Sequence, residues 1–134
     1  MPASILVVED NRANMELTDF LLKASGYTPV LAHGGAEGVR LAAEQRPDLI
    51  LMDIQMPEMD GYEATAAIKR DPALGVCPVV AVTAFAMVGD RDRIMSHGFA
   101  GYISKPIEAE TFVTQVEAYL SPQLRGAGPA ASGT

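Results

Sequence analysis

Several polar side chains of this 134-residue chain each lie at or just past the C-terminal end of a short predicted strand. They are Glu9, Asp10, Asp53, Thr83 and Lys105. Carboxylates that share one place repel one another and attract a cation. Oxygen ligands without histidine or cysteine favour a hard cation, and Mg²⁺, which takes one or two carboxylates and keeps several waters, fits better than Ca²⁺. If these residues converge, the sequence predicts a Mg²⁺ site.

Asp53 is the carboxylate best suited to act as a nucleophile at such a site. The ammonium group of Lys105 and the metal would offset the charge of a phosphoryl group, and the hydroxyl of Thr83 would donate a hydrogen bond to it. The product would be an aspartyl phosphate. Taken alone, Asp53 could equally cap a turn, so the chemical interpretation depends on the other strand ends.

The elements that must position these residues alternate between strand and helix patterns. Strands are expected at 4–8, 28–32, 49–52, 78–82 and 101–104, and helices at about 12–25, 36–45, 62–70, 90–96 and 109–120. Asn11 is the expected N-cap of the first helix, and Pro29 places the second strand at a sheet edge. The alternation predicts a three-layer α/β/α sandwich with a five-stranded parallel sheet. In such sheets the site lies outside the carboxyl ends of the strands.

Composition narrows the class of protein. The net charge of -7 argues against binding a nucleic acid backbone. No apolar run approaches the roughly 20 residues of a membrane helix, and no signal peptide pattern is present, so a cytoplasmic location is expected. Cys77 is the only cysteine, which excludes an intramolecular disulfide. One domain is expected over residues 1–121, followed by a disordered Gly/Ala/Pro-rich tail at 122–134.

Four motifs resemble those of response-regulator receiver domains in type, order and spacing: VVEDN at 7–11, LMDIQMPEMDG at 51–61, VTA at 82–84 and SKP at 104–106. The resemblance covers about residues 4–120 and implies the CheY-like, flavodoxin-like strand order 2-1-3-4-5. The stretches 79–87 and 101–107 look most like single-domain DivK-type regulators and receivers of hybrid kinases. The acidic pair is Glu-Asp, where many members have Asp-Asp.

The resemblance implies a role for each matching residue in a two-component phosphorelay. Asp53 would accept a phosphoryl group from a histidine kinase or phosphotransfer protein, and the chain would catalyse only its own phosphorylation and dephosphorylation. The Mg²⁺ ligands would be Asp10, Asp53 and the Gln55 backbone carbonyl, with Glu9 acting through water. Thr83 and Lys105 would hold the phosphoryl oxygens. The Lys105-Pro106 peptide bond would be cis.

The resemblance also implies how the phosphorylated state would be transmitted. Thr83 and Tyr102 would form the switch, since movement of the hydroxyl opens space for the ring. A downstream protein would bind the surface formed by the elements at 90–96, 101–104 and 109–120, next to the loop 84–89.

The residues leave other readings open. A phosphatase of the haloacid-dehalogenase type also forms an aspartyl phosphate, but it has a second aspartate two residues after the nucleophile, where this chain has Gln55. A flavodoxin-like FMN carrier needs a phosphate loop rich in Ser, Thr and Gly after the first strand, which is absent. The chain could also be a receiver excised from a hybrid histidine kinase. His33, His97, Glu58 and Asp60 are expected to be solvated loop residues. Met87 and Val88 are expected to be partly exposed, and a partner or switch surface is an equal alternative for them.

Overall fold

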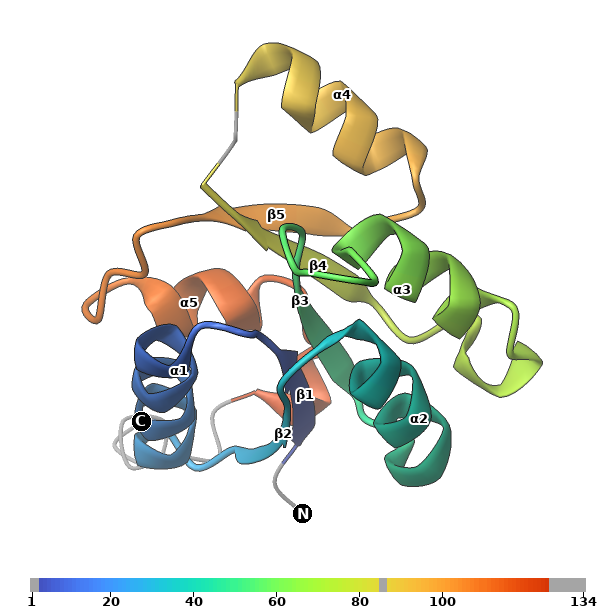
Figure 1. The fold of residues 1–134 in the computed structure, drawn as a ribbon. Helices are drawn as coiled ribbons and strands as arrows, with labels where there is room; N and C mark the ends of the chain where they lie inside the picture. The colour runs from blue at the N-terminus through green and yellow to red at the C-terminus, as the bar shows by residue number, and fades with distance from the viewer. Residues whose placement is uncertain (1–2, 85–86, 126–134) are drawn as a thin grey trace.

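The structure is a computed structural model that describes residues 3–84 and 87–125. Its five strands form one parallel sheet in the order β2-β1-β3-β4-β5 (Figure 1). The strands are β1 (Ser4–Val8), β2 (Thr28–Ala32), β3 (Leu49–Asp53), β4 (Val79–Thr83) and β5 (Gly101–Ser104). The helices are α1 (Arg12–Ala24), α2 (Gly35–Gln45), α3 (Gly61–Lys69), α4 (Val88–Ser96) and α5 (Phe112–Glu117). The predicted fold class and strand order are confirmed.

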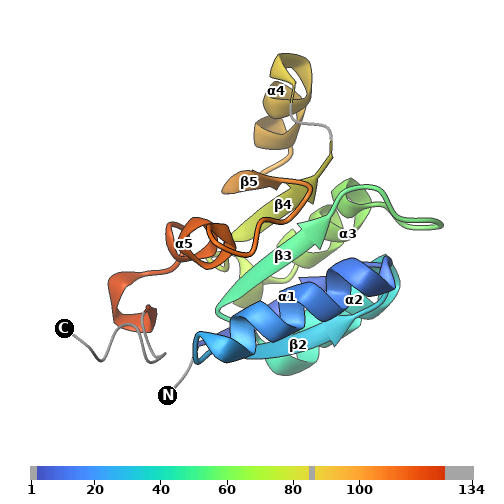
Figure 2. The same cartoon turned by 90° about the vertical axis from the view of Figure 1, so that its left-hand side faces the viewer.

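Helices cover both faces of the sheet and create two separate hydrophobic cores. Helices α1 and α5 pack on one face, and α2, α3 and α4 lie over the other (Figure 2). The first core includes Ala42 of α2, Ile68 of α3 and Ile94 of α4. The second includes Leu22 of α1 and Phe112 of α5. The sheet is therefore buried between two helical layers, as expected for parallel strands.

Strand β3 lies in the middle of the sheet and contributes to both cores. Ile50 and Met52 belong to the core under α2, α3 and α4, whereas Leu49 and Leu51 belong to the core under α1 and α5. This two-sided burial explains why the run has no polar alternation. Strand β2 is an edge strand, as predicted from Pro29.

Several predicted boundaries differ from the structure by one residue or more. Helix α5 is shorter than the expected 109–120, because the backbone N–H groups of Tyr119 and Leu120 bond three residues back and tighten the chain into turns. Strand β4 begins at Val79, because Pro78 has no N–H to donate. It ends one residue later than predicted, at Thr83. Helix α4 begins at Val88, so it takes up part of the loop expected at 84–89; residues 85–86 lie outside the described residues.

Asp60 is not a freely solvated loop residue, and this prediction was wrong. Its carboxylate caps α3 by accepting a hydrogen bond from the Glu63 N–H at 2.9 Å, while the Glu63 side chain accepts one from the Asp60 N–H at 3.1 Å. This reciprocal capping box satisfies two backbone donors at the helix start. His33, His97 and Glu58 are exposed, as predicted.

The expected tail falls largely on residues 126–134, which lie outside the described part of the chain. Its first residues form a short 3-10 helix, η2 (Pro122–Leu124), and Leu124 packs against the core under α1 and α5. In residues 3–84 and 87–125 the longest helix is too short and too polar to cross a membrane.

Candidate functional site

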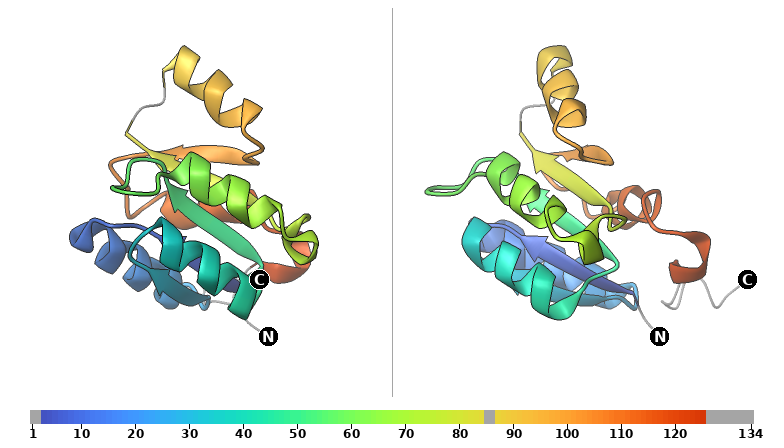
Figure 3. Two further views of the ribbon diagram at one scale, coloured as in Figure 1. Left: turned by 45° about the vertical axis from the view of Figure 1, so that its right-hand side comes forward. Right: turned by 90° about the vertical axis from the view of Figure 1, so that its right-hand side faces the viewer.

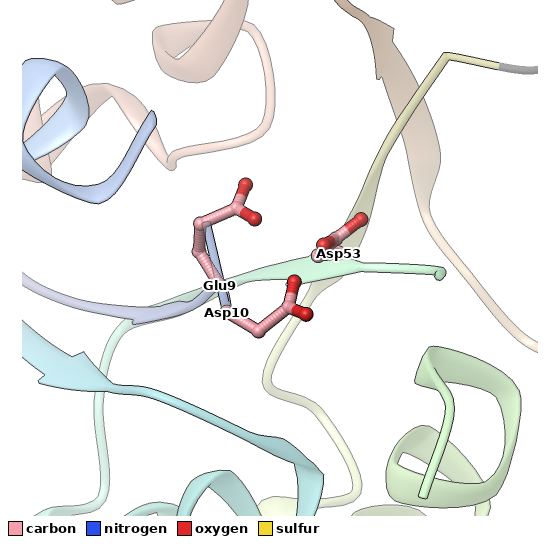
Figure 4. Close-up of side chains that lie close together, drawn as sticks. All are labelled: Glu9, Asp10 and Asp53. Atoms are coloured by element: carbon pink, nitrogen blue, oxygen red, sulfur yellow. The ribbon is translucent and has the colours of Figure 1, made fainter. Parts of the chain in front are cut away.

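Three carboxylates gather at the carboxyl edge of the sheet. Glu9 and Asp10 directly follow β1, and Asp53 is the last residue of the neighbouring strand β3. The parallel register pairs Val8 with Met52, so the residues that follow reach the same edge. One oxygen of each carboxylate lies within 4.8 Å of one oxygen of the others (Figure 4). Glu9 and Asp53 are buried, whereas Asp10 is exposed.

Lys105 brings a positive charge into this acidic cluster. Its Nζ lies 3.1 Å from Glu9 Oε1 and 3.2 Å from Asp53 Oδ1. The backbone N–H of Lys105 donates to the carbonyl oxygen of Thr83 at 2.8 Å, which fastens the end of β5 to the end of β4. The peptide bond Lys105-Pro106 is cis, as the sequence resemblance implied. The ammonium group is therefore the local counter-charge of two buried carboxylates.

The cluster shifts the protonation of its own members. Burial, followed by the hydrogen bond and the negative charge of Glu9, raises the pKa of Asp53 from 3.8 to about 7, although Lys105 opposes the shift. Burial lowers the pKa of Lys105, but the carboxylates of Asp53 and Glu9 outweigh burial and raise it overall. A buried carboxylate that resists ionisation in this way gains most from a bound cation.

A hollow of about 330 Å³ lies beside the carboxylates. It is lined by Glu9, Asp10, Asn11, Asn14, Asp53, Gln55, Thr83, Ala84 and Lys105. All predicted metal and phosphoryl-binding residues are in this set, and their individual roles stay predictions. The backbone N–H of Gln55 donates to Asp53 Oδ1 at 3.3 Å, which fixes the orientation of that carboxylate. Carboxylate oxygens around a small hollow suit a hard divalent cation such as Mg²⁺.

Three lining residues, Asn11, Asn14 and Ala84, were not predicted as part of the site. Asn11 was expected only as the N-cap of α1; it does cap the helix, with its Oδ1 accepting the Asn14 N–H at 2.9 Å. Its own N–H donates to Glu9 Oε2 at 3.1 Å, so it also holds a buried carboxylate. Asn14 lies almost one helical turn after the cap, and this spacing could have placed it at the same edge.

The loop between β3 and α3 approaches Asp53 very closely. The N–H of Gly61 donates to the carbonyl oxygen of Ile54 at 2.9 Å. A Cβ atom at Gly61 would overlap the carbonyl oxygen of Asp53. Only glycine allows the chain to return over the end of β3 at this point.

Tyr102 lies outside the hollow, on β5. The register of β4 and β5 pairs it with Ala81, and Thr83 follows two residues later on the same face of β4. Tyr102 is half-buried against the core under α2, α3 and α4. Tyr102 and Thr83 are therefore diagonal neighbours on one face of the sheet, and the residue beside the ring is only an alanine.

Comparison with known proteins agrees with this geometry. Residues 5–117 match the family described as Response regulator receiver domain. The chain is 51% identical over 120 residues to the polar-differentiation response regulator DivK of Brucella anthropi, which covers 90% of this chain and 98% of that protein. DivK of Brucella ovis is 49% identical over the same length.

Solved structures of a receiver domain and of a chemotaxis protein also resemble this chain. The receiver domain of the sensor histidine kinase PA1611 of Pseudomonas aeruginosa superimposes with a TM-score of 0.81 at 34% identity, over 89% of this chain and 98% of that one. That structure has a magnesium ion coordinated in its active site cleft. The chemotaxis protein CheY4 of Vibrio cholerae gives a TM-score of 0.86 at 25% identity, over 90% of this chain and all of that one.

Proposed function

This chain belongs to the response regulator receiver domain family and is a DivK-like regulator of a two-component system, and from this premise we propose how its acidic pocket works. Asp53 accepts a phosphoryl group from the phosphohistidine of a histidine kinase or phosphotransfer protein. The observation that carries this proposal is the convergence of Glu9, Asp10, Asp53 and Lys105 at one edge of the sheet.

Mg²⁺ would be held by Asp10, Asp53 and the backbone carbonyl of Gln55, with Glu9 acting through a water molecule. The donor set supports this assignment, because it offers only oxygen ligands and includes a buried carboxylate that ionises with difficulty. When bound, the cation would supply positive charge against both the carboxylates and the incoming phosphoryl oxygens.

The residues of the chain position and stabilise the transferred group. An oxygen of the Asp53 carboxylate forms a bond to phosphorus while the bond from phosphorus to the donor's histidine nitrogen breaks, and its electron pair stays on that nitrogen. Lys105 already lies 3.2 Å from Asp53 Oδ1, so its ammonium can contact a phosphoryl oxygen after a small movement. Thr83 donates from the neighbouring strand end.

Water later hydrolyses the aspartyl phosphate, which returns the carboxylate and releases phosphate. The chain therefore acts on itself and is not an enzyme with a separate turnover substrate. Gln55 occupies the position at which a haloacid-dehalogenase-type phosphatase has its general acid, and an amide cannot perform that proton transfer. The similarity to DivK over nearly the whole of that protein supports a DivK-like role over that of a hybrid-kinase receiver.

Labelling with a small phosphodonor tests the assignment. Acetyl phosphate and Mg²⁺ should phosphorylate the wild-type chain, as measured by intact-protein mass spectrometry, and should leave Asp53→Asn unlabelled. Glu58→Gln is the matched control, because Glu58 is an exposed acid of the neighbouring loop and should be dispensable. Labelling of Asp53→Asn at the wild-type level would disprove the role of Asp53.

Phosphorylation is transmitted through Thr83 and Tyr102. When the Thr83 hydroxyl moves to bond a phosphoryl oxygen, it opens space on the face of β4 that Tyr102 also occupies. The diagonal position of the two residues, with the small side chain of Ala81 opposite Tyr102 in the strand register, supports this route. The two positions of the ring form a bistable element whose populations depend on phosphorylation. The downstream protein binds the surface of α4, β5 and α5, where Met87 is largely exposed.

A further inference from the structure

Helix α4 is held to the rest of the molecule by few contacts. Of its side chains that the structure describes, Ile94 is the only buried one. The helix stands apart from the sheet in two different views (Figure 1, Figure 3). An element with so little buried apolar surface can move at low cost, and its resting position depends on the remaining side-chain contacts.

Two of these contacts are cation–π pairs, each made by a different arginine of α4. The Arg91 guanidinium carbon lies 5.5 Å from the centroid of the Tyr102 ring. The Arg93 guanidinium carbon lies 4.5 Å from the centroid of Tyr62, which belongs to α3 and also contacts the ring of His97 at 4.5 Å. The two arginines therefore link α4 to different elements. Arg91 contacts Tyr102 of the proposed switch, and Arg93 contacts Tyr62 of α3.

The Arg91 contact restricts where the Tyr102 ring can lie. A cation–π attraction requires the cation within about 6 Å of the ring centroid. At 5.5 Å the pair is already close to this limit, so a rotation that takes the ring farther from the guanidinium loses the attraction unless α4 follows. The contact thus favours the present position of the ring over positions farther from Arg91.

We propose that Arg91 is a positioning residue that retains Tyr102 in its resting position and so sets the balance of the switch before phosphorylation. This inference rests on the proposed function, because it assumes that the Tyr102 ring moves. A cation–π contact at an exposed site changes an equilibrium constant by roughly two- to fivefold. Removing the guanidinium should raise the resting equilibrium constant for displacement of the ring by that factor.

The test uses fluorotyrosine placed only at Tyr102 and read by fluorine NMR. Four proteins are compared: the wild type, Arg91→Gln, Arg91→Lys and Arg93→Gln. Each is measured without ligand and with Mg²⁺ and beryllofluoride, which imitates the phosphoryl group. In the ligand-free state, Arg91→Gln should shift the signal towards the beryllofluoride position by two- to fivefold in equilibrium constant. Arg91→Lys, which keeps the cation, should recover part of the wild-type signal.

Arg93→Gln is the matched control, because it removes the same charge from the same helix but from a different ring. Its ligand-free signal should equal that of the wild type. An equal shift in both glutamine variants would overturn the inference, since it would mean that α4 is merely loosened. No shift in Arg91→Gln would also overturn it. If beryllofluoride leaves the signal unchanged even in the wild type, the proposed Thr83–Tyr102 switch itself is wrong.

Discussion

Replacing Asp53 with asparagine should stabilise the metal-free protein, and the gain should depend on pH. Burial and the nearby Glu9 raise the pKa of Asp53 from 3.8 to about 7. Between these two values the folded protein keeps a proton on Asp53 that the unfolded chain has already released. The free energy of unfolding of the wild type therefore falls as pH rises from about 4 to about 7. Asparagine carries no charge and avoids this loss.

The size of the effect follows from the shift. The difference between 3.8 and about 7 corresponds to roughly 4 kcal/mol at about 1.36 kcal/mol per pKa unit. Almost the whole of this should be gained by Asp53→Asn at pH 8, where the wild-type carboxylate is ionised in both states. At pH 5 only the unfolded chain is ionised, and the expected gain falls to about 2 kcal/mol.

Urea unfolding followed by circular dichroism at both pH values, with EDTA present, measures these gains. Asp92→Asn serves as the control, because Asp92 is an exposed acid of α4 and its replacement should change stability little at either pH. A gain that is equal at pH 5 and pH 8 would refute the reasoning. A loss of stability at pH 8 would show that the ion pair with Lys105 outweighs burial of the charge.

Three further outcomes are expected. Mg²⁺ at about a hundredfold above its Kd should stabilise the wild type by ~2.7 kcal/mol in denaturant unfolding. The Asp10→Asn variant should lose most of that gain. An equal gain in the wild type and the variant would contradict the assignment of Asp10 as a ligand. Gly61→Ala should destabilise the fold by about 1–3 kcal/mol through overlap with the end of β3, whereas Gly89→Ala, with open space around it, should not. Thr83→Ala should still be phosphorylated, perceptibly more slowly, but its Tyr102 fluorine signal should no longer respond fully to beryllofluoride.

The sequence predicted most of the fold because each strand differs sharply from its flanking turns. The run at 49–52 has no polar residue and ends on Asp53, which is what a strand buried on both faces requires. The strand order came from the family resemblance, since several orders are compatible with the same alternation of elements. The ends of α5 were missed because they depend on local turn hydrogen bonds that residue types do not specify.

The members of the site were predictable because parallel strands place their carboxyl ends at one edge. The ion pair between Lys105 and Glu9 was not predictable, because it depends on side-chain conformations that only the folded structure defines. Asn14 was missed although its spacing from Asn11 carried a usable signal. Asp60 was misread because the pattern of an aspartate three residues before Glu63, which predicts a capping box, was not applied to it.

The direction of the strands also determines how this protein can be attached to a surface. Strand β1 begins with Ser4 at the edge of the sheet opposite the acidic pocket, and Leu124 of η2 packs against the same core as Ala3. A tether joined near either of these residues would leave the pocket facing the solution. Chains immobilised in this way should therefore keep the pocket accessible to a phosphodonor, which suits surface-plasmon measurements of the encounter. Tethers placed at the exposed side chain of Asp10 would instead block the pocket.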